Sequence, residues 1–140
     1  MDITAKKSYL LNKSRYDIND LIDLVEILRS ESGCPWDREQ THETIRNNLI
    51  EETYEVVEGI DTQNPSLLRE ELGDLLFQIV FHTQIEREGD RFILDDIITD
   101  VTAKMIHRHP HVFADVSVTG TGEVLSNWEK IKQRKNKESP

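Results

Sequence analysis

The chain has 140 residues, of which 36% are hydrophobic and 31% charged, and its formal net charge is −10. This is the length of one domain, and no apolar run approaches the roughly 20 residues that cross a bilayer. The negative charge disfavours sequence-independent binding to nucleic acid, so we expect neither a membrane nor a nucleic acid as partner.

The beginning of the chain is polar and aperiodic. We expect residues 1–16 to form a flexible N-terminal arm, followed by a single domain over residues 17–137. The arm lacks the apolar core of a signal peptide, and the single cysteine, Cys34, cannot form an internal disulfide. Both features favour the cytoplasm.

Two helices are predicted in the first half of the domain. Asp17 is suited to an N-cap, and apolar residues recur at helical spacing after it, so a helix is expected from Asp17 to just before Gly33. The segment "SGCPWDREQTH", residues 32–42, is typical of a turn because glycine and proline break helices. A second helix should follow over about residues 42–60.

Three more helices are predicted after it. Asn64 and Pro65 match an N-cap with proline at the first helical position, which opens a helix that ends at Gly89. Further helices are expected over about residues 95–108 and 122–137. Only "HVFADVSV", residues 111–118, resembles a strand, so the predicted class is all-α, an antiparallel bundle of about five helices.

Two carboxylates stand at the head of the third predicted helix. Seven of the ten residues from Leu72 to Phe81 are large and apolar, yet Glu71 and Asp74 lie there three residues apart. A buried carboxylate normally takes up a proton unless a cation and hydrogen bonds keep it charged. Acids in a first helical turn also complement the helix dipole, which is the alternative role for this pair.

The second predicted helix carries a matching pair. Glu52 and Glu55 are again three residues apart and lie beside the apolar arc of their helix. If the two helices pack antiparallel, the four carboxylates converge in a dry interior and require a cation. Oxygen ligands suit Mg²⁺, with Mn²⁺ possible, rather than Zn²⁺. The alternative for the second helix is an ordinary solvated acidic face.

These motifs resemble a known family. "EETYE" (51–55) followed after fifteen residues by "ELGD" (71–74) is similar to the EExxE…ExxD signature of MazG-type nucleoside triphosphate pyrophosphohydrolases. "GCPWDREQTH" and "RHPHVF" resemble the stretches that flank it. The resemblance runs from about Leu21 to Lys132 and matches the N-terminal copy of two-copy members. It implies an all-α, Mg²⁺-dependent homodimer that hydrolyses NTPs or dNTPs to NMP and pyrophosphate and so removes surplus or aberrant nucleotides.

The resemblance also implies roles for individual residues. The metal ligands would be Glu52, Glu55, Glu71 and Asp74, and the catalytic residues Glu51, Glu52 and Glu55, with Glu51 as an additional ligand or a base that orients water. The substrate-binding residues would be Lys104, Arg108, Trp128 and Lys132. The first two are spaced i, i+4 on one predicted helix and the last two on another, so each pair shares a face.

Alternative roles remain open for these residues and for the chain. Cations favour a helix C-terminus, and Trp128 could be a core or interface aromatic. The histidines in "HRHPH", His107, His109 and His111, lack zinc spacing and are expected in a loop. The rival functions are a non-catalytic helical nucleotide-binding or interaction module and a di-iron carboxylate bundle. The second needs two Glu-x-x-His motifs, and only Glu39 and His42 fit the spacing.

Overall fold

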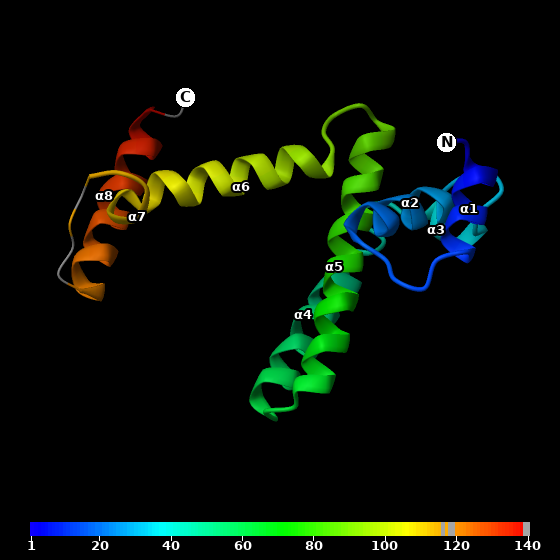
Figure 1. Cartoon of the computed structure of the whole chain (residues 1–140), viewed down its shortest axis with the longest axis horizontal. Coiled ribbons are helices and arrows are strands. Elements are labelled where there is room, and N and C mark those ends of the chain that lie inside the picture. Colours follow the sequence, from blue (N-terminus) through cyan, green and yellow to red (C-terminus); the bar gives the residue numbers. More distant parts are fainter. Residues whose placement is uncertain (116, 118–119, 139–140) are drawn as a thin grey trace. The chain divides into compact units, whose positions relative to one another are not determined.

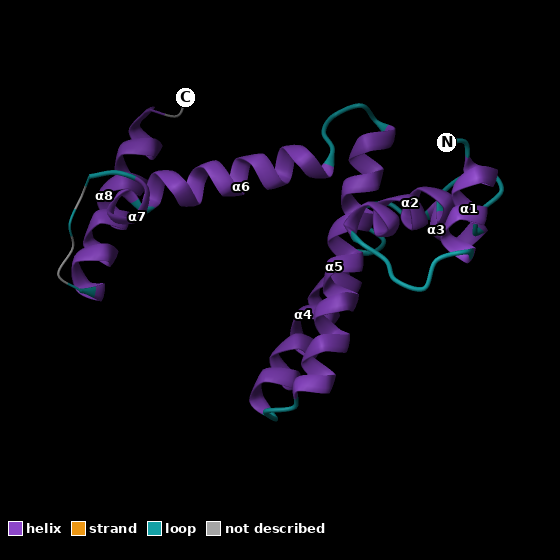
Figure 2. Ribbon diagram, viewed as in Figure 1, coloured by secondary structure: helices purple, strands orange, loops and turns teal. Residues whose placement is uncertain are grey.

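The fold is all-α, as predicted. A computed structural model describes residues 1–115, 117 and 120–138, with side chains described as far as Arg134, and these residues contain helices and no strand (Figure 2). None of the described helices is both long and apolar enough to span a bilayer. The chain divides into two compact units, Met1–Ile93 and Leu94–Pro140.

Eight helices are found in the described residues, three more than predicted. The first unit contains α1 (Ile3–Leu11), α2 (Ile18–Leu28), α3 (Pro35–Glu39), α4 (Arg46–Asp61) and α5 (Pro65–Glu88) (Figure 1). The second contains α6 (Leu94–Arg108), α7 (Pro110–Phe113) and α8 (Thr121–Glu138). The additional helices are α1, α3 and α7, and all three are short.

The N-terminal residues differ from the loose arm that the sequence predicted. Helix α1 begins after Asp2, whose side chain accepts a hydrogen bond from the backbone N–H of Ala5. Lys6 then forms ion pairs with Glu26 at 2.7 Å and Asp23 at 3.3 Å on α2. Because α1 has no buried residue, hydrophobic periodicity could not reveal it.

The starts of α2 and α5 agree with the prediction. Asp17 accepts a hydrogen bond from the backbone N–H of Asp20, and the Asp20 carboxylate accepts one from the backbone N–H of Asp17, which forms a capping box. The Asn64 side chain accepts from the backbone N–H of Leu67, and Pro65 occupies the first turn of α5. These caps are local, so the sequence identifies them.

Two other segments were predicted incorrectly. The expected turn over residues 32–42 contains helix α3, and the following helix begins at Arg46 rather than at His42. The first part of the strand-like segment 111–118 belongs to helix α7, whereas residues 116 and 118 lie outside the described residues. Pro35 and Pro110 each stand at the first position of one of these short helices, where proline is favoured.

Helices α4 and α5 form an antiparallel hairpin joined by three residues (Figure 1). Gly59 on α4 is buried, and a Cβ atom added there would come within 2.9 Å of the Leu68 Cα on α5. The backbones therefore approach closely at this end of the hairpin. This contact sets which turns of the two helices face each other.

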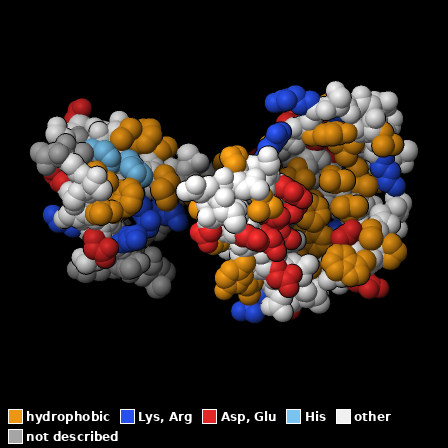
Figure 3. Space-filling view, turned by 90° about the horizontal axis from the view of Figure 1, so that it is seen from below, with side chains coloured by type: hydrophobic (Ala, Val, Ile, Leu, Met, Phe, Trp, Pro, Cys, Tyr) orange, Lys and Arg blue, Asp and Glu red, His pale blue; other side chains and the backbone are white. Residues whose placement is uncertain are grey.

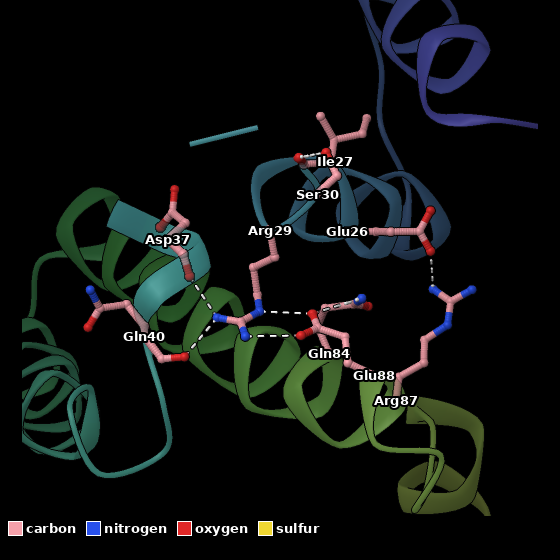
Figure 4. A network of polar contacts seen from close by, with 9 residues as sticks. All are labelled: Glu26, Ile27, Arg29, Ser30, Asp37, Gln40, Gln84, Arg87 and Glu88. Atoms are coloured by element: carbon pink, nitrogen blue, oxygen red, sulfur yellow. Dashed lines mark hydrogen bonds and ion pairs between the residues drawn. The ribbon is translucent and has the colours of Figure 1, made fainter. Parts of the chain in front are cut away.

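The other end of α5 packs against α2 (Figure 1). Val25 and Ile27 on α2, and Val80 and Phe81 on α5, are buried. Arg29 joins the same elements (Figure 4): its guanidinium donates to the Glu88 carboxylate and to the backbone carbonyls of Asp37 and Gln40. The first half of α5 is thus left to pair with α4.

Candidate metal centre

Three carboxylates from the hairpin meet between α4 and α5. Glu52 comes from α4, and Glu71 and Asp74 come from successive turns of α5. One oxygen of each carboxylate lies within 4.8 Å of one oxygen of each of the others. We call Glu52, Glu71 and Asp74 the acidic triad.

The acidic triad is open to solvent on one side, unlike the dry interior that the sequence predicted. Glu71 is buried, with 9% of its surface exposed, and Glu52 is half-buried, but Asp74 and Glu55 are exposed. Two paired helices cover only the facing side of each other. Residues that are rotated away from this side, as Asp74 is relative to Glu71, remain in contact with water.

The fourth predicted ligand, Glu55, lies close to the acidic triad but outside it. Its charge raises the pKa of Glu52 and of Glu71, so its carboxylate is within electrostatic range of both. Glu51 is exposed and raises the pKa of Glu52 as well. The five acids of the predicted site therefore form one region of negative potential, with the acidic triad at its centre.

Burial and mutual repulsion disfavour the charged forms in this region. Desolvation raises the pKa of Glu71, and the charges of Asp74, Glu55 and Glu52 raise it further. Desolvation and Asp74 likewise raise the pKa of Glu52, while a hydrogen bond with Glu71 partly opposes this. No Lys or Arg among the described residues forms an ion pair with any of the three.

These properties match the requirements of a divalent cation. A cation would relieve the repulsion, and three carboxylate oxygens within 4.8 Å can reach one hard ion together. Neither histidine nor cysteine belongs to the group. The ligand set therefore fits Mg²⁺ or Mn²⁺ better than Zn²⁺.

The cations predicted to bind substrate lie in the other unit. Lys104 and Arg108 on α6 line a cavity of about 900 Å³ within the unit Leu94–Pro140. Trp128 and Lys132 on α8 are not among the residues that line it. Trp128 is instead half-buried, and its ring forms a T-shaped pair with the His109 ring, with 5.0 Å between centroids; Lys132 is exposed.

The three histidines of "HRHPH" do not lie in a simple loop. His107 is in the last turn of α6, His109 is the N-cap of α7, and His111 is within α7. The rings of His109 and His111 are 5.4 Å apart, and no metal-binding group that includes them is found among the described residues. The rings of His109, His111 and Trp128 form one aromatic cluster, in which His109 contacts both of the others.

A second cluster of polar side chains was not anticipated from the sequence. His42, in the turn after α3, lies against His82 and Glu86 on α5, with His42 Nε2 2.6 Å from a Glu86 carboxylate oxygen. His42 therefore does not join Glu39 in a metal-binding motif of the di-iron type. The only signal for this cluster in the sequence was a histidine, His82, within the apolar half of α5.

Most of this chain is similar in sequence to known proteins. Residues 40–113 match the model of the MazG nucleotide pyrophosphohydrolase domain. The chain is similar to the nucleoside triphosphate pyrophosphohydrolase/pyrophosphatase MazG of Thermotoga maritima, with 49% identity over 119 residues that cover 84% of this chain and 45% of that protein. It is also 49% identical, over 116 residues, to the nucleoside triphosphate pyrophosphohydrolase of Escherichia coli strain K12, covering 82% of this chain and 44% of that protein.

A solved structure is similar over most of the fold. A mazG-related protein from Thermotoga maritima matches with a TM-score of 0.68 and 27% identity, and the match covers 83% of this chain and 99% of that one. In contrast, the chain spans less than half the length of the two curated relatives. Both helices that carry the acidic triad lie inside the matched residues 40–113.

Proposed function

Because this chain belongs to the MazG nucleotide pyrophosphohydrolase domain family, we propose that it hydrolyses nucleoside triphosphates to a nucleoside monophosphate and pyrophosphate. The observation that carries the proposal is the acidic triad, in which Glu52, Glu71 and Asp74 meet and form no ion pair with a described Lys or Arg. The two full-length relatives are named for this activity, and the present chain covers 45% and 44% of them. We extend the activity to this chain because the triad is complete within it.

We propose that Glu52, Glu71 and Asp74 hold Mg²⁺, or Mn²⁺ in its place, with Glu55 as a fourth ligand. A divalent ion bound there supplies charge neutralisation at phosphate oxygens and lowers the pKa of a bound water. Glu51, which is exposed and next to Glu52 in the sequence, is proposed to accept a proton from water or to orient it. The products NMP and pyrophosphate correspond to attack at the α-phosphorus.

The substrate is proposed to be an NTP or dNTP, with Lys104 and Arg108 among its phosphate-binding residues. Lys104 and Arg108 line one cavity and share a helix face, which suits a polyphosphate. Trp128 and Lys132 remain proposed substrate contacts through their resemblance to family positions. The net charge of −10 makes nucleic acid an unfavourable partner.

We also propose that two copies of the chain associate. Helix α4 leaves Ile50, Tyr54 and Val57 exposed, and α5 leaves Leu72, Leu76 and Ile79 exposed, each set at helical spacing. In Figure 3, acidic side chains lie next to hydrophobic ones on the visible face of the larger body, at the right of the view. A second copy would remove such apolar strips from water.

The biological role proposed is the removal of surplus or aberrant nucleotides in the cytoplasm. A single cysteine agrees with a reducing compartment. The second candidate function is a non-catalytic nucleotide-binding module, and it is favoured by one observation. Asp74 and Glu55 are exposed, as acids of an ordinary charged surface are.

The test is incubation of the purified chain with a panel of NTPs and dNTPs and Mg²⁺. We expect NMP and pyrophosphate in equal amounts, and their loss when Glu71 is replaced by Gln. Release of NDP and phosphate would contradict the assigned bond. Nucleotide binding without either product, unchanged by Glu71→Gln, would favour the non-catalytic module.

A further inference from the structure

The cavity of about 900 Å³ in the second unit is lined by two helices. Lys104, His107 and Arg108 come from the C-terminal half of α6, and Arg134 comes from α8. Apolar side chains, among them Ile97, Val101 and Ile131, make up much of the rest of the wall. A cation beside apolar walls interacts more strongly with an anion than one surrounded by water.

Arg134 reaches this cavity because of its place on α8. Ile131 is buried with 9% exposure and also lines the cavity, and Arg134 follows it by three residues, so the two share a helix face. Lys132 is only one residue from Ile131 and does not line the cavity. Of the basic side chains described on α8, which are Lys130, Lys132 and Arg134, the rotation of the helix thus brings Arg134 to the cavity.

The charges in the cavity are unbalanced and opposite to those of the chain. The described side chains that line it include three cations, Lys104, Arg108 and Arg134, and one acid, Asp100, whereas the whole chain has a net charge of −10. Among the described residues, no ion pair is formed by Lys104, Arg108 or Arg134. Three cations that are concentrated in one cavity, with no ion pair to another described residue, favour an anionic ligand with several charges.

We propose that Arg134 is a third phosphate-binding residue, which completes with Lys104 and Arg108 a pocket for the polyphosphate chain of a nucleotide. A guanidinium presents its N–H donors in a fork that matches two oxygens of a phosphate, so two arginines and a lysine can contact successive phosphates. The inference rests on the proposed function for the identity of the ligand. It adds Arg134 of α8, which belongs to none of the motifs found in the sequence.

Asp100 has the opposite effect in the same pocket. Its carboxylate lines the cavity one helical turn before Lys104 and repels phosphate. It therefore weakens the binding of a polyphosphate without Mg²⁺, and its removal should strengthen this binding. A gain of affinity cannot result from a damaged fold, which makes Asp100 a useful counterpart to Arg134.

The experiment is calorimetric titration of the full chain with inorganic triphosphate in EDTA at fixed ionic strength. EDTA removes divalent ions, so no metal at the acidic triad contributes to binding. Five proteins are compared: the wild type, Arg134→Gln, Arg134→Lys, Asp100→Asn and Lys130→Gln. Lys130 is exposed on α8 outside the cavity, and its variant changes the net charge by the same amount as Arg134→Gln.

We expect Arg134→Gln to weaken triphosphate binding by about 10-fold, the usual effect of losing a hydrogen bond to a charged group. Asp100→Asn should bind a few-fold more tightly, and Lys130→Gln should stay within about two-fold of the wild type. Equal weakening by Arg134→Gln and Lys130→Gln would overturn the proposal, as would no binding by the wild type. Arg134→Lys should recover part of the affinity.

Failure of this inference can be distinguished from failure of the proposed function. If NTPs with Mg²⁺ give NMP and pyrophosphate but Arg134→Gln binds triphosphate like the wild type, the assignment of Arg134 is wrong and the activity stands. If the order of affinities is as expected but no NMP appears, the proposed hydrolysis is wrong and the pocket stands as a polyphosphate site.

Discussion

The imidazole rings of His42 and His82 stack with their Nδ1 atoms 2.7 Å apart. Only one hydrogen can lie between the two nitrogens, so one ring donates and the other accepts. His42 also contacts Glu86 through Nε2, and Arg91 pairs with the other oxygen of that carboxylate. The pair joins the turn before α4 to the C-terminal half of α5, and it requires that at least one histidine be neutral.

This relationship predicts that the chain loses stability in mild acid. Burial, and secondarily the charge of His42, lower the pKa of His82 below its usual 6.5. The unfolded state then binds more protons than the folded state below about pH 6.5, so the contribution of neutral His82 is present above this pH and is lost as the pH falls. Urea unfolding between pH 8 and 5 should show a smaller loss for His82→Asn than for the wild type.

Comparing the wild type with His82→Asn cancels the contributions to pH-dependent stability that both proteins share. One shared contribution is Glu86, whose pKa Arg91 and His42 lower, so its stabilisation is lost only below about its usual value of 4.5. Parallel curves for wild type and His82→Asn from pH 8 to 5 would show that His82 does not titrate in this way.

In the absence of metal, Glu71 should affect stability in the opposite direction to His82: uptake of a proton by Glu71 should stabilise the fold. The raised pKa of Glu71 means that its charged form destabilises the fold at neutral pH, and that stability rises as the pH falls towards the usual value of 4.5. Glu71→Gln should therefore unfold at a higher temperature than the wild type in EDTA at pH 7.5.

With Mg²⁺ the order of thermal stability of the wild type and Glu71→Gln should change. The wild type should gain thermal stability with increasing Mg²⁺, whereas Glu71→Gln should gain little and should lose at least ~100-fold in NTP hydrolysis. The measurement is scanning calorimetry with and without Mg²⁺, together with a product assay. An equal gain with Mg²⁺ in both proteins would mean that the ion binds elsewhere.

Two glycines of the hairpin should respond differently to the same substitution. A Cβ at Gly59 would lie 2.9 Å from Leu68 Cα and 3.0 Å from Leu68 N, which are backbone atoms that cannot easily move. Gly59→Ala should cost about 1–3 kcal/mol in the free energy of unfolding. At Gly73 on α5 nothing lies within 4 Å of the added atom.

Gly73→Ala is therefore the control for Gly59→Ala. Alanine is favoured over glycine within a helix, so this variant should gain about 0.5–1 kcal/mol. Chemical denaturation of both variants checks the difference. Similar effects at the two positions would show that α4 and α5 are not in close contact at Gly59.

Arg29 should contribute more to stability than its surface partner Glu88. The Arg29 side chain is 7% exposed and that of Glu88 is 40% exposed, and Arg29 also donates to the carbonyls of Asp37 and Gln40 at 2.6 and 3.0 Å. Arg29→Ala leaves these carbonyls without their donor and should cost about 2–3 kcal/mol. Glu88→Ala should cost less than about 1 kcal/mol.

Arg29→Lys distinguishes shape from charge in this network. Lysine keeps the positive charge, but its single nitrogen cannot bind both Glu88 oxygens and the two backbone carbonyls at once. We therefore expect only part of the lost stability to be recovered in urea unfolding. Full recovery would mean that the charge of Arg29, and not its planar fork, holds α2, α3 and α5 together.

The exposed apolar strip of α5 predicts a variant that separates the proposed dimer. Ile79 is 40% exposed, and Ile79→Glu would place a charge in an interface that excludes water. Light scattering after gel filtration should change from the mass of two chains to that of one. Leu125→Glu, at a position on α8 that is 54% exposed, is the matched control and should leave the mass unchanged.

Local interactions were enough to predict the fold class, and the resemblance of the sequence motifs was enough to predict the family. Asp17, and Asn64 with Pro65, mark helix starts through hydrogen bonds and backbone angles that involve only neighbouring residues, so these starts were predicted correctly. Helical spacing also placed Glu71 and Asp74 on adjacent turns of one helix. Short helices such as α1 were missed because they bury no apolar face.

Which of these side chains meet depends on how the helices pack. The approach of α4 to α5 at Gly59 brings Glu52 to Glu71 and leaves Glu55 and Asp74 in contact with water. The rotation of α8 places Arg134, and not Lys132, in the cavity that Lys104 lines. Spacing along a helix is fixed by the backbone, whereas the depth and rotation of one helix against another depend on packing between residues far apart in the chain.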